Sequence, residues 1–220
     1  MNDELSLRAA PGFVDPVVAL ELPGLRLLWQ RLDARERTSP PALIRQLRDR
    51  SNRVRGGDVI ATRTQPIPSA YRSFFRQIGM DPDRERIPSE QAAVDRLFYG
   101  GFRSAGLVPD ALLLALVETG VPIWALDGDR VGPGGLGIRT AVERERLGEE
   151  PTAPPVAPGT LVVADETCVH GVLFGPTAPD SAVSRRTRRL VLFSVAVSGV
   201  PDIHVEEAFW LVYEALNSAL

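Results

Sequence analysis

The chain has 220 residues, of which 44% are hydrophobic and 24% are charged, and its net charge is −3. This length is enough for one domain of ordinary size with an appendage. No stretch approaches the ~20 consecutive apolar residues that a membrane span needs, and the N-terminus has no basic region before an apolar run. Cys168 is the only cysteine, which excludes an internal disulfide. We therefore expect a cytoplasmic protein with no membrane partner.

All 25 basic residues are arginines. The lack of lysine excludes Schiff-base chemistry, so any anion must be recognised by guanidinium groups, backbone N–H groups or hydroxyls. A negative net charge does not exclude tRNA binding, because a local basic patch is sufficient for it. Two arginine clusters are candidates, and each could equally be a solvated helix or loop surface: Arg45, Arg48, Arg50, Arg53 and Arg55, and then Arg185, Arg186, Arg188 and Arg189.

The first quarter of the chain contains patterns typical of both strands and helices. A short β-branched run predicts a strand over 14–22, and apolar residues then recur at helical spacing over 25–32. A Ser-Pro-Pro start predicts a helix over 39–57, stopped by two glycines. We expect residues 1–57 to form a helical N-terminal arm packed on the main body, which comprises residues 58–220.

The body begins with helical patterns and then changes to strand patterns. Proline, serine and glycine signals predict helices over 69–79, 88–101 and 109–119, the last of them deeply buried. Strands are predicted over 121–127, 136–141, 160–165, 168–174 and 189–197, followed by an amphipathic helix over 204–219. Helices grouped before strands, with a closing helix, indicate an α+β domain with a mixed β-sheet.

The densest group of reactive side chains lies around the predicted strand 168–174. Cys168 and His170 share one side of that strand, and Asp165 and Glu166 precede it. Zinc requires three or four ligands, so we predict no metal site here, although a Cys-His pair remains geometrically compatible with one. Cys168 acting as a nucleophile with His170 as its base is a second alternative. The glycine-rich segment 128–137 has neither a following helix nor a lysine, so we predict no nucleotide cofactor.

Three stretches of the chain, taken in order, resemble one family. Residues 70–82 read AYRSFFRQIGMDP and residues 86–90 read RIPSE, and both are similar to the opening of freestanding B3/B4-domain proteins. Residues 108–127 resemble the helix and strand at the centre of that module. Residues 136–141, 163–165 and 187–193 resemble its later strands. The resemblance covers about residues 58–215, and it implies a B3/B4-like α+β fold, as in the phenylalanyl-tRNA synthetase β-chain.

In that family the module forms the pocket in which a wrongly attached amino acid is hydrolysed from tRNA. The family places a Thr-Asn pair and a histidine in this pocket, and the corresponding positions here are Leu112, Leu113 and Trp124. Replacing three hydrogen-bonding groups by apolar ones removes contacts that would orient a polar substrate and a water. The scaffold is therefore expected to be retained while the family's own editing arrangement is not.

Three functions stay open. The first is a trans-acting aminoacyl-tRNA deacylase with a rearranged site, the second a non-catalytic protein that binds tRNA or an amino-acid-like ligand, and the third a scaffold or partner-binding module. For the first we expect no cofactor, because carboxylates can position a water and arginine can hold an anion. The candidate residues are Asp165, Glu166 and His170 for catalysis, Asp110, Leu113, Trp124 and Arg139 for the substrate, and Arg185, Arg186 and Arg188 for tRNA.

Overall fold

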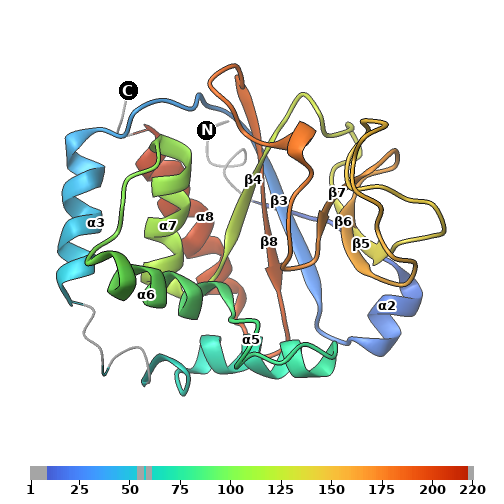
Figure 1. Ribbon diagram of the computed structural model, residues 1–220, viewed down its shortest axis with the longest axis horizontal. Coiled ribbons are helices and arrows are strands. Elements are labelled where there is room, and N and C mark those ends of the chain that lie inside the picture. Colours follow the sequence, from blue (N-terminus) through green and yellow to red (C-terminus); the bar gives the residue numbers. More distant parts are fainter. Residues whose placement is uncertain (1–8, 54–56, 58–60, 218–220) are drawn as a thin grey trace. The chain divides into compact units, whose positions relative to one another are not determined.

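The computed structural model describes residues 9–53, 57 and 61–217. It has the α+β architecture predicted from the sequence, with two four-stranded sheets and a set of helices (Figure 1). The chain falls into two compact units, each built from two segments. We call Met1–Glu36 with Trp124–Ala196 the sheet unit, and Arg37–Ile123 with Val197–Leu220 the helical unit. Among the described residues, no helix combines the length and the apolar character needed to cross a membrane.

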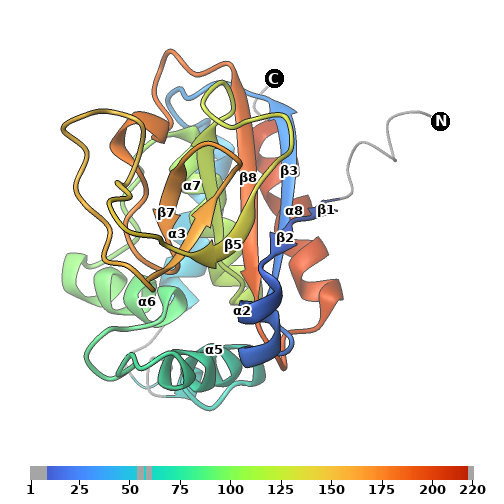
Figure 2. The same ribbon diagram turned by 90° about the vertical axis from the view of Figure 1, so that its right-hand side faces the viewer.

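The first sheet of the sheet unit has the strand order β1-β3-β8-β4. Its two long strands, β3 and β8, pair antiparallel over eight residues each, from Arg26 opposite Ala196 to Asp33 opposite Arg189. Both run side by side in Figures 1 and 2. The strands are β1 (Ala10–Pro11), β3 (Arg26–Asp33), β4 (Ile123–Asp127) and β8 (Arg189–Ala196).

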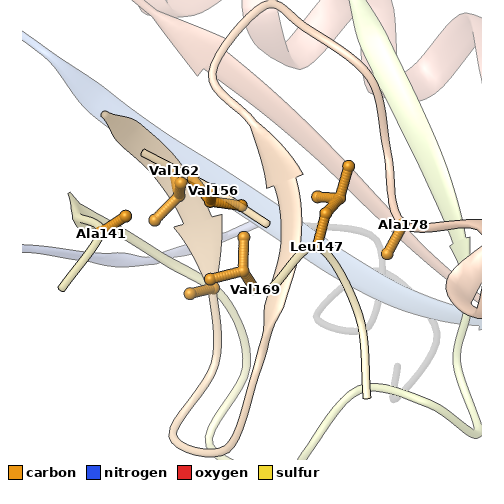
Figure 3. Packing of buried hydrophobic residues seen from close by; sticks show 7 residues of the cluster. Ala141, Leu147, Val156, Val162, Val169 and Ala178 are labelled. Carbon is orange, nitrogen blue, oxygen red and sulfur yellow. The ribbon is translucent and has the colours of Figure 1, made fainter. Parts of the chain in front are cut away.

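The second sheet has the order β2-β5-β6-β7 and is mixed, because β2 runs parallel to β5 while the other pairs are antiparallel. Its strands are β2 (Phe13–Val14), β5 (Gly137–Thr140), β6 (Leu161–Ala164) and β7 (Val169–Val172). A small apolar core packs on β6 and β7 and holds the proline-rich 149–159 segment against the sheet (Figure 3). Its members include Ala141, Leu147, Val156, Val162, Val169 and Ala178.

The helical unit is centred on α7 (Leu107–Thr119), which packs against its neighbours α3, α6 and α8. As its apolar sequence predicted, much of α7 is buried, and it ends where Gly120 adopts a left-handed conformation with φ 74°. The other helices are α3 (Pro41–Arg53), α5 (Pro66–Gln77), α6 (Pro88–Tyr99) and α8 (Asp202–Asn217). Each predicted helix of this unit is therefore confirmed.

A buried ion pair joins α5 to α6. Arg72 donates from Nη1 to both carboxylate oxygens of Glu90 at 2.9 Å and to the carbonyl of Pro82 at 3.3 Å. Burial alone would lower the pKa of Arg72, but the hydrogen bonds to Asp83 and Glu90 outweigh it and raise that pKa. The arginine and the glutamate of the stretches 70–82 and 86–90 are thus partners in one structural contact.

Two early predictions are wrong. The 14–22 segment forms a helix, α2 (Pro16–Glu21), because Asp15 caps it by accepting from the backbone N–H groups of Val17 and Val18, and Pro16 occupies its first turn. The 25–32 segment is not helical but is strand β3, because its backbone groups pair along the whole length of β8. Tertiary pairing overrides an ambiguous apolar spacing at this position.

Helix boundaries also differ from the predictions. Helix α5 begins at Pro66, three residues before the predicted Ser69 cap, because a proline fits the first turn without a side-chain cap. Arg55, Gly56 and Ala219, which belonged to predicted elements, lie outside the described residues. The compact units are each made of two chain segments, and the division into an arm (1–57) and a body (58–220) stays a prediction.

Candidate functional site

The predicted acid–base residues meet at the turn between β6 and β7. Asp165 follows β6 and His170 lies on β7, and the short connection between the strands brings His170 Nε2 within 2.9 Å of Asp165 Oδ2. Both side chains are almost completely buried, with 1% of Asp165 and none of His170 exposed. Asp165 and His170 are therefore in direct contact, and their chemistry depends on what else they bind.

The carboxylate of Asp165 accepts five hydrogen bonds. Oδ1 accepts from the backbone N–H and hydroxyl of Thr167 at 2.7 and 2.8 Å and from the N–H of Cys168 at 2.9 Å. Oδ2 accepts from the N–H of Gly132 at 2.8 Å and from His170. Burial alone would raise the pKa of Asp165, but these donors outweigh it and hold the pKa well below its usual range. Asp165 is thus a fixed anion that organises two turns.

His170 continues the network to a third element. Its Nδ1 lies 2.9 Å from the hydroxyl of Ser181, at the end of the 3-10 helix η1 (Pro179–Ser181). With its proton on Nε2, the imidazole donates to Asp165 and accepts from Ser181, so both ring nitrogens are satisfied. A serine nucleophile must reach a substrate, and Ser181 is only 2% exposed. This Ser-His-Asp chain is therefore a closed structural network.

Cys168 lies beside the same imidazole. Its Sγ is 3.7 and 3.6 Å from Nδ1 and Nε2 of His170, and the ligand atoms of Asp165, Cys168 and His170 lie within 4.8 Å of one another. Burial and the neighbouring carboxylates raise the pKa of the thiol to about 12. A thiolate is the form that attacks substrates and binds metals, so this neutral thiol is poorly prepared for either role. The carboxylate and the imidazole are already fully hydrogen-bonded.

Glu166 differs from its neighbours. It is exposed and, among the described residues, forms no hydrogen bond or ion pair. Its Oε1 lies close to the 132–135 turn, where a Cβ added to Gly134 would come within 2.9 Å of it. Of the three predicted catalytic residues, Glu166 alone has a carboxylate that is free to meet a ligand or a water.

The predicted substrate residues of the sheet unit are committed to internal contacts. Arg139 on β5 forms a two-pronged ion pair with Glu145, at 2.8 and 2.6 Å. This contact raises the pKa of Arg139 and, from the other side, lowers that of Glu145. Trp124 on β4 stacks on Phe193 at 5.3 Å and meets Phe174 edge-on at 5.6 Å. Trp124 is therefore part of an aromatic cluster of the sheet.

The other two predicted substrate residues belong to the helical unit. Asp110 is buried in the first turn of α7, where it accepts from the hydroxyls of Ser39 and Ser104 at 2.5 Å each and from the N–H of Ala105 at 2.9 Å. An acidic side chain at that position stabilises the helix start. Leu113 is half-buried on the same helix. Asp110 thus has a complete structural role.

The predicted tRNA-binding arginines lie in the exposed loop before β8. Arg188 Nη1 turns back to the carbonyls of Arg185, Arg186 and Thr187, at 2.9 to 3.1 Å, and so rigidifies the loop. The side chains of Arg185 and Arg186 form no hydrogen bond or ion pair with any described residue. Two guanidinium groups are therefore available to an anion.

Sequence reasoning missed a cavity in the helical unit. It measures about 520 Å³, and Arg50 and Arg53 of α3 line it. Both residues belong to the first arginine cluster, so the sequence already indicated a group of cations in this region. Composition could not tell which arginines of the cluster face a cavity, because that depends on how α3 packs.

Comparison with known proteins shows a likeness to part of a larger protein. The chain is 35% identical over 142 residues to the phenylalanine–tRNA ligase β subunit of Gloeobacter violaceus. The aligned region is 62% of this chain but only 17% of that subunit, so this chain spans less than a fifth of its relative. No protein-family model matches the chain. The protein is therefore an α+β protein with a domain similar to a limited part of a phenylalanine–tRNA ligase β subunit.

Proposed function

We propose that this protein contains a B3/B4-type domain that recognises tRNA or aminoacyl-tRNA. The observation that carries the proposal is the 35% identity to part of a tRNA ligase subunit. Because the likeness covers 17% of that subunit, it supports a shared domain for tRNA recognition and gives no support for the ligation reaction. The Tyr-Arg and Pro-Ser-x-Glu stretches of the resemblance, joined through Arg72 and Glu90, are consistent with a retained scaffold.

The contact with tRNA is assigned to the loop before β8. Arg185 and Arg186 present free guanidinium groups there, and Arg188 holds the loop backbone in place. Guanidinium groups bind phosphate oxygens through paired hydrogen bonds. A few such contacts release condensed counterions, so the affinity should fall steeply with salt.

Hydrolysis of a mischarged aminoacyl-tRNA is a second candidate, favoured by the free carboxylate of Glu166. In this reaction Glu166 would take a proton from a water whose oxygen attacks the ester carbon. The carbon–oxygen bond to the terminal ribose then breaks, and the ribose oxygen takes up the proton, which releases the amino acid and the tRNA. Asp165 and His170 would position the turn that carries Glu166.

The test combines binding and turnover in the same set of variants. Binding of uncharged tRNA and of a panel of correctly and incorrectly charged tRNAs is measured across a salt series, together with release of the amino acid. Arg185→Gln with Arg186→Gln should weaken binding and reduce the magnitude of the salt slope by roughly one to two. The matched control, Arg84→Gln with Arg86→Gln, removes two exposed charges from the loop between α5 and α6, outside both arginine clusters.

Turnover decides between the two candidates. Release of one mischarged amino acid, lost at least tenfold in Glu166→Gln, would support hydrolysis. Saturable binding without release would leave recognition alone. Absence of both, combined with a stable complex with another protein, would overturn the tRNA proposal in favour of a partner-binding module.

A further inference from the structure

The helical unit contains an open cavity of about 520 Å³, lined by residues of α3, α5, α6, α7 and α8 and of the segments between them. This volume lies in the range of about 300–1,000 Å³ that is typical of sites for small molecules. On α7 the lining residues are those of its C-terminal turn, Leu116 to Gly120. The positions that correspond to the B3/B4 family's editing pocket, Leu112, Leu113 and Trp124, do not line it. The cavity is thus distinct from the family's site.

One side of the cavity is apolar. Ile67 at the start of α5, Ala93 on α6, Phe102 and Leu116 contribute hydrocarbon surface to the lining. Small side chains on α6 leave room where a larger residue would fill the space. An apolar ligand group of the size of a benzene ring gains free energy by leaving water for such a surface, at about 25 cal/mol per Å² buried. The lining therefore suits a ligand with an apolar body.

The polar side has an excess of one positive charge. Arg50 is paired with Glu118 of α7, so these two charges compensate each other. Arg53, one turn further along α3, is exposed and forms no hydrogen bond or ion pair with a described residue. A free guanidinium at the edge of an apolar cavity attracts an anion, and its fork matches a carboxylate.

A buried hydroxyl adds a second, independent observation. Ser89 Oγ, in the first turn of α6, is inaccessible to solvent and has no hydrogen-bond partner among the described residues. Ser89 also lines the cavity. Leaving a buried polar group unpaired costs about 1–3 kcal/mol, and a rotation about the Cα–Cβ bond of Ser89 that brings the hydroxyl to the cavity would let a ligand atom recover this cost. An oxygen-bearing ligand would supply the missing partner.

From these features we propose that the cavity binds a small organic carboxylate, a molecule that joins one carboxylate group to an apolar body. Arg53 would hold the carboxylate, Ser89 would hydrogen-bond to an oxygen of the ligand, and the wall around Phe102 and Leu116 would cover the apolar part. A free apolar amino acid and a simple arylalkanoic acid share this chemistry. They differ in the ammonium group, which Glu118 would contact only by sharing its carboxylate with Arg50. The site goes beyond the proposed recognition of tRNA and does not depend on it.

The experiment is calorimetric titration of the full chain with four probes: 3-phenylpropionate, L-phenylalanine, the neutral 3-phenylpropan-1-ol and inorganic phosphate. A carboxylate probe should bind saturably with a stoichiometry of one, and the alcohol at least tenfold more weakly. Tighter binding of L-phenylalanine than of 3-phenylpropionate would identify an amino acid as the ligand class, and the reverse order a simple carboxylate. Binding of phosphate but of neither carboxylate would overturn the proposal.

Two variants and a control locate the binding. Arg53→Gln should weaken binding of the carboxylate probe at least tenfold. Ala93→Phe should abolish binding, because the larger side chain fills the cavity. Arg48→Gln removes an exposed arginine from the same helix without touching the cavity, so it should leave the affinity unchanged. Circular dichroism verifies that each variant is folded. An equal effect of Arg48→Gln and Arg53→Gln, or no saturable binding to the parent chain, would refute the site.

Discussion

His170 Nε2 donates to Asp165 Oδ2 across 2.9 Å, and neither side chain has more than 1% of its surface exposed. This contact belongs to a buried hydrogen-bond network. Asp165 also accepts from the N–H of Gly132, and His170 also contacts the hydroxyl of Ser181. Three segments far apart in the chain are therefore fixed by two side chains. Glu166, next in sequence, remains outside this network.

Replacing Asp165 should destabilise the protein, whereas replacing Glu166 should not. Asp165→Asn removes the negative charge and places an amide donor among five hydrogen-bond donors, so we expect a loss on the order of 3 kcal/mol in the free energy of unfolding. Glu166→Gln should stay within about 0.5 kcal/mol, as for other surface positions. Urea denaturation of both variants and the parent checks this. Equal stabilities would show that the network contributes little.

The carboxylate of Asp165 should also make the free energy of unfolding depend on pH in the acidic range. The pKa of Asp165 is lowered in the folded protein, so its contribution is fully present above the unfolded value of about 3.9. The contribution is then lost as the pH falls below that value toward the folded pKa. Thermal melts from pH 6 to pH 3 should show the gap between the parent and Asp165→Asn narrowing below about pH 4. A gap that stays constant over this range would contradict the assignment.

Cys168 should be unreactive in the native protein. Burial and nearby carboxylates raise its pKa to about 12, and the thiol is only 9% exposed, so almost no accessible thiolate exists at neutral pH. Because it is the only cysteine, a thiol-specific reagent reports on this residue alone. We expect slow labelling at pH 7.5 and rapid labelling in 6 M guanidinium, roughly as fast as a free peptide thiol. Rapid labelling of the folded chain would contradict this expectation and support the alternative in which Cys168 is a nucleophile.

Breaking the pair between α5 and α6 should be costly. Glu90→Gln removes the buried partner of Arg72 and leaves it only the exposed Asp83, so we expect a loss near the low end of the about 3–5 kcal/mol that is typical of breaking a buried pair. Arg189→Gln is the control, because its pair with Asp129 is exposed, lies outside this network and should contribute no more than about 1 kcal/mol. Denaturant midpoints of the two variants give the comparison. Similar losses in both would mean that burial does not set the strength of the Arg72–Glu90 pair.

Two glycines with nearly the same positive φ should respond differently to replacement by alanine. Gly135 and Gly159 have φ of 81° and 80°, so each Gly→Ala change carries a conformational cost of about 1–2 kcal/mol. At Gly135 the new Cβ would also overlap the ring of Trp29, whereas at Gly159 it would meet open space. We expect Gly135→Ala to lose clearly more stability in thermal unfolding. Equal losses would show that Trp29 moves aside without cost.

Local signals predicted most of the helices and strands. The helices that begin at Pro41 and Pro88 and the one that ends before Gly120 follow from proline and glycine positions, which act within a few residues. The five later strands follow from β-branched and apolar runs. Strand β3 did not, because its pattern suits either element and its partner β8 lies more than 150 residues away along the chain. Sequence spacing carries no information about that pairing.

In the candidate site, too, the sequence predicted local positions and the tertiary structure determined the contacts. The sequence placed Asp165, Glu166 and His170 at one turn, because the spacing of residues within a turn and a strand is fixed by backbone geometry. Their roles were decided by Gly132 and Ser181, which only the folded sheet unit brings to them. Likewise, the sequence supplied an arginine cluster on α3, and the packing of the helical unit selected Arg53 as the free cation at a cavity. Hydrogen bonding and burial depend on neighbours in space, so the tertiary structure alone determined which polar groups are satisfied and which remain free to bind.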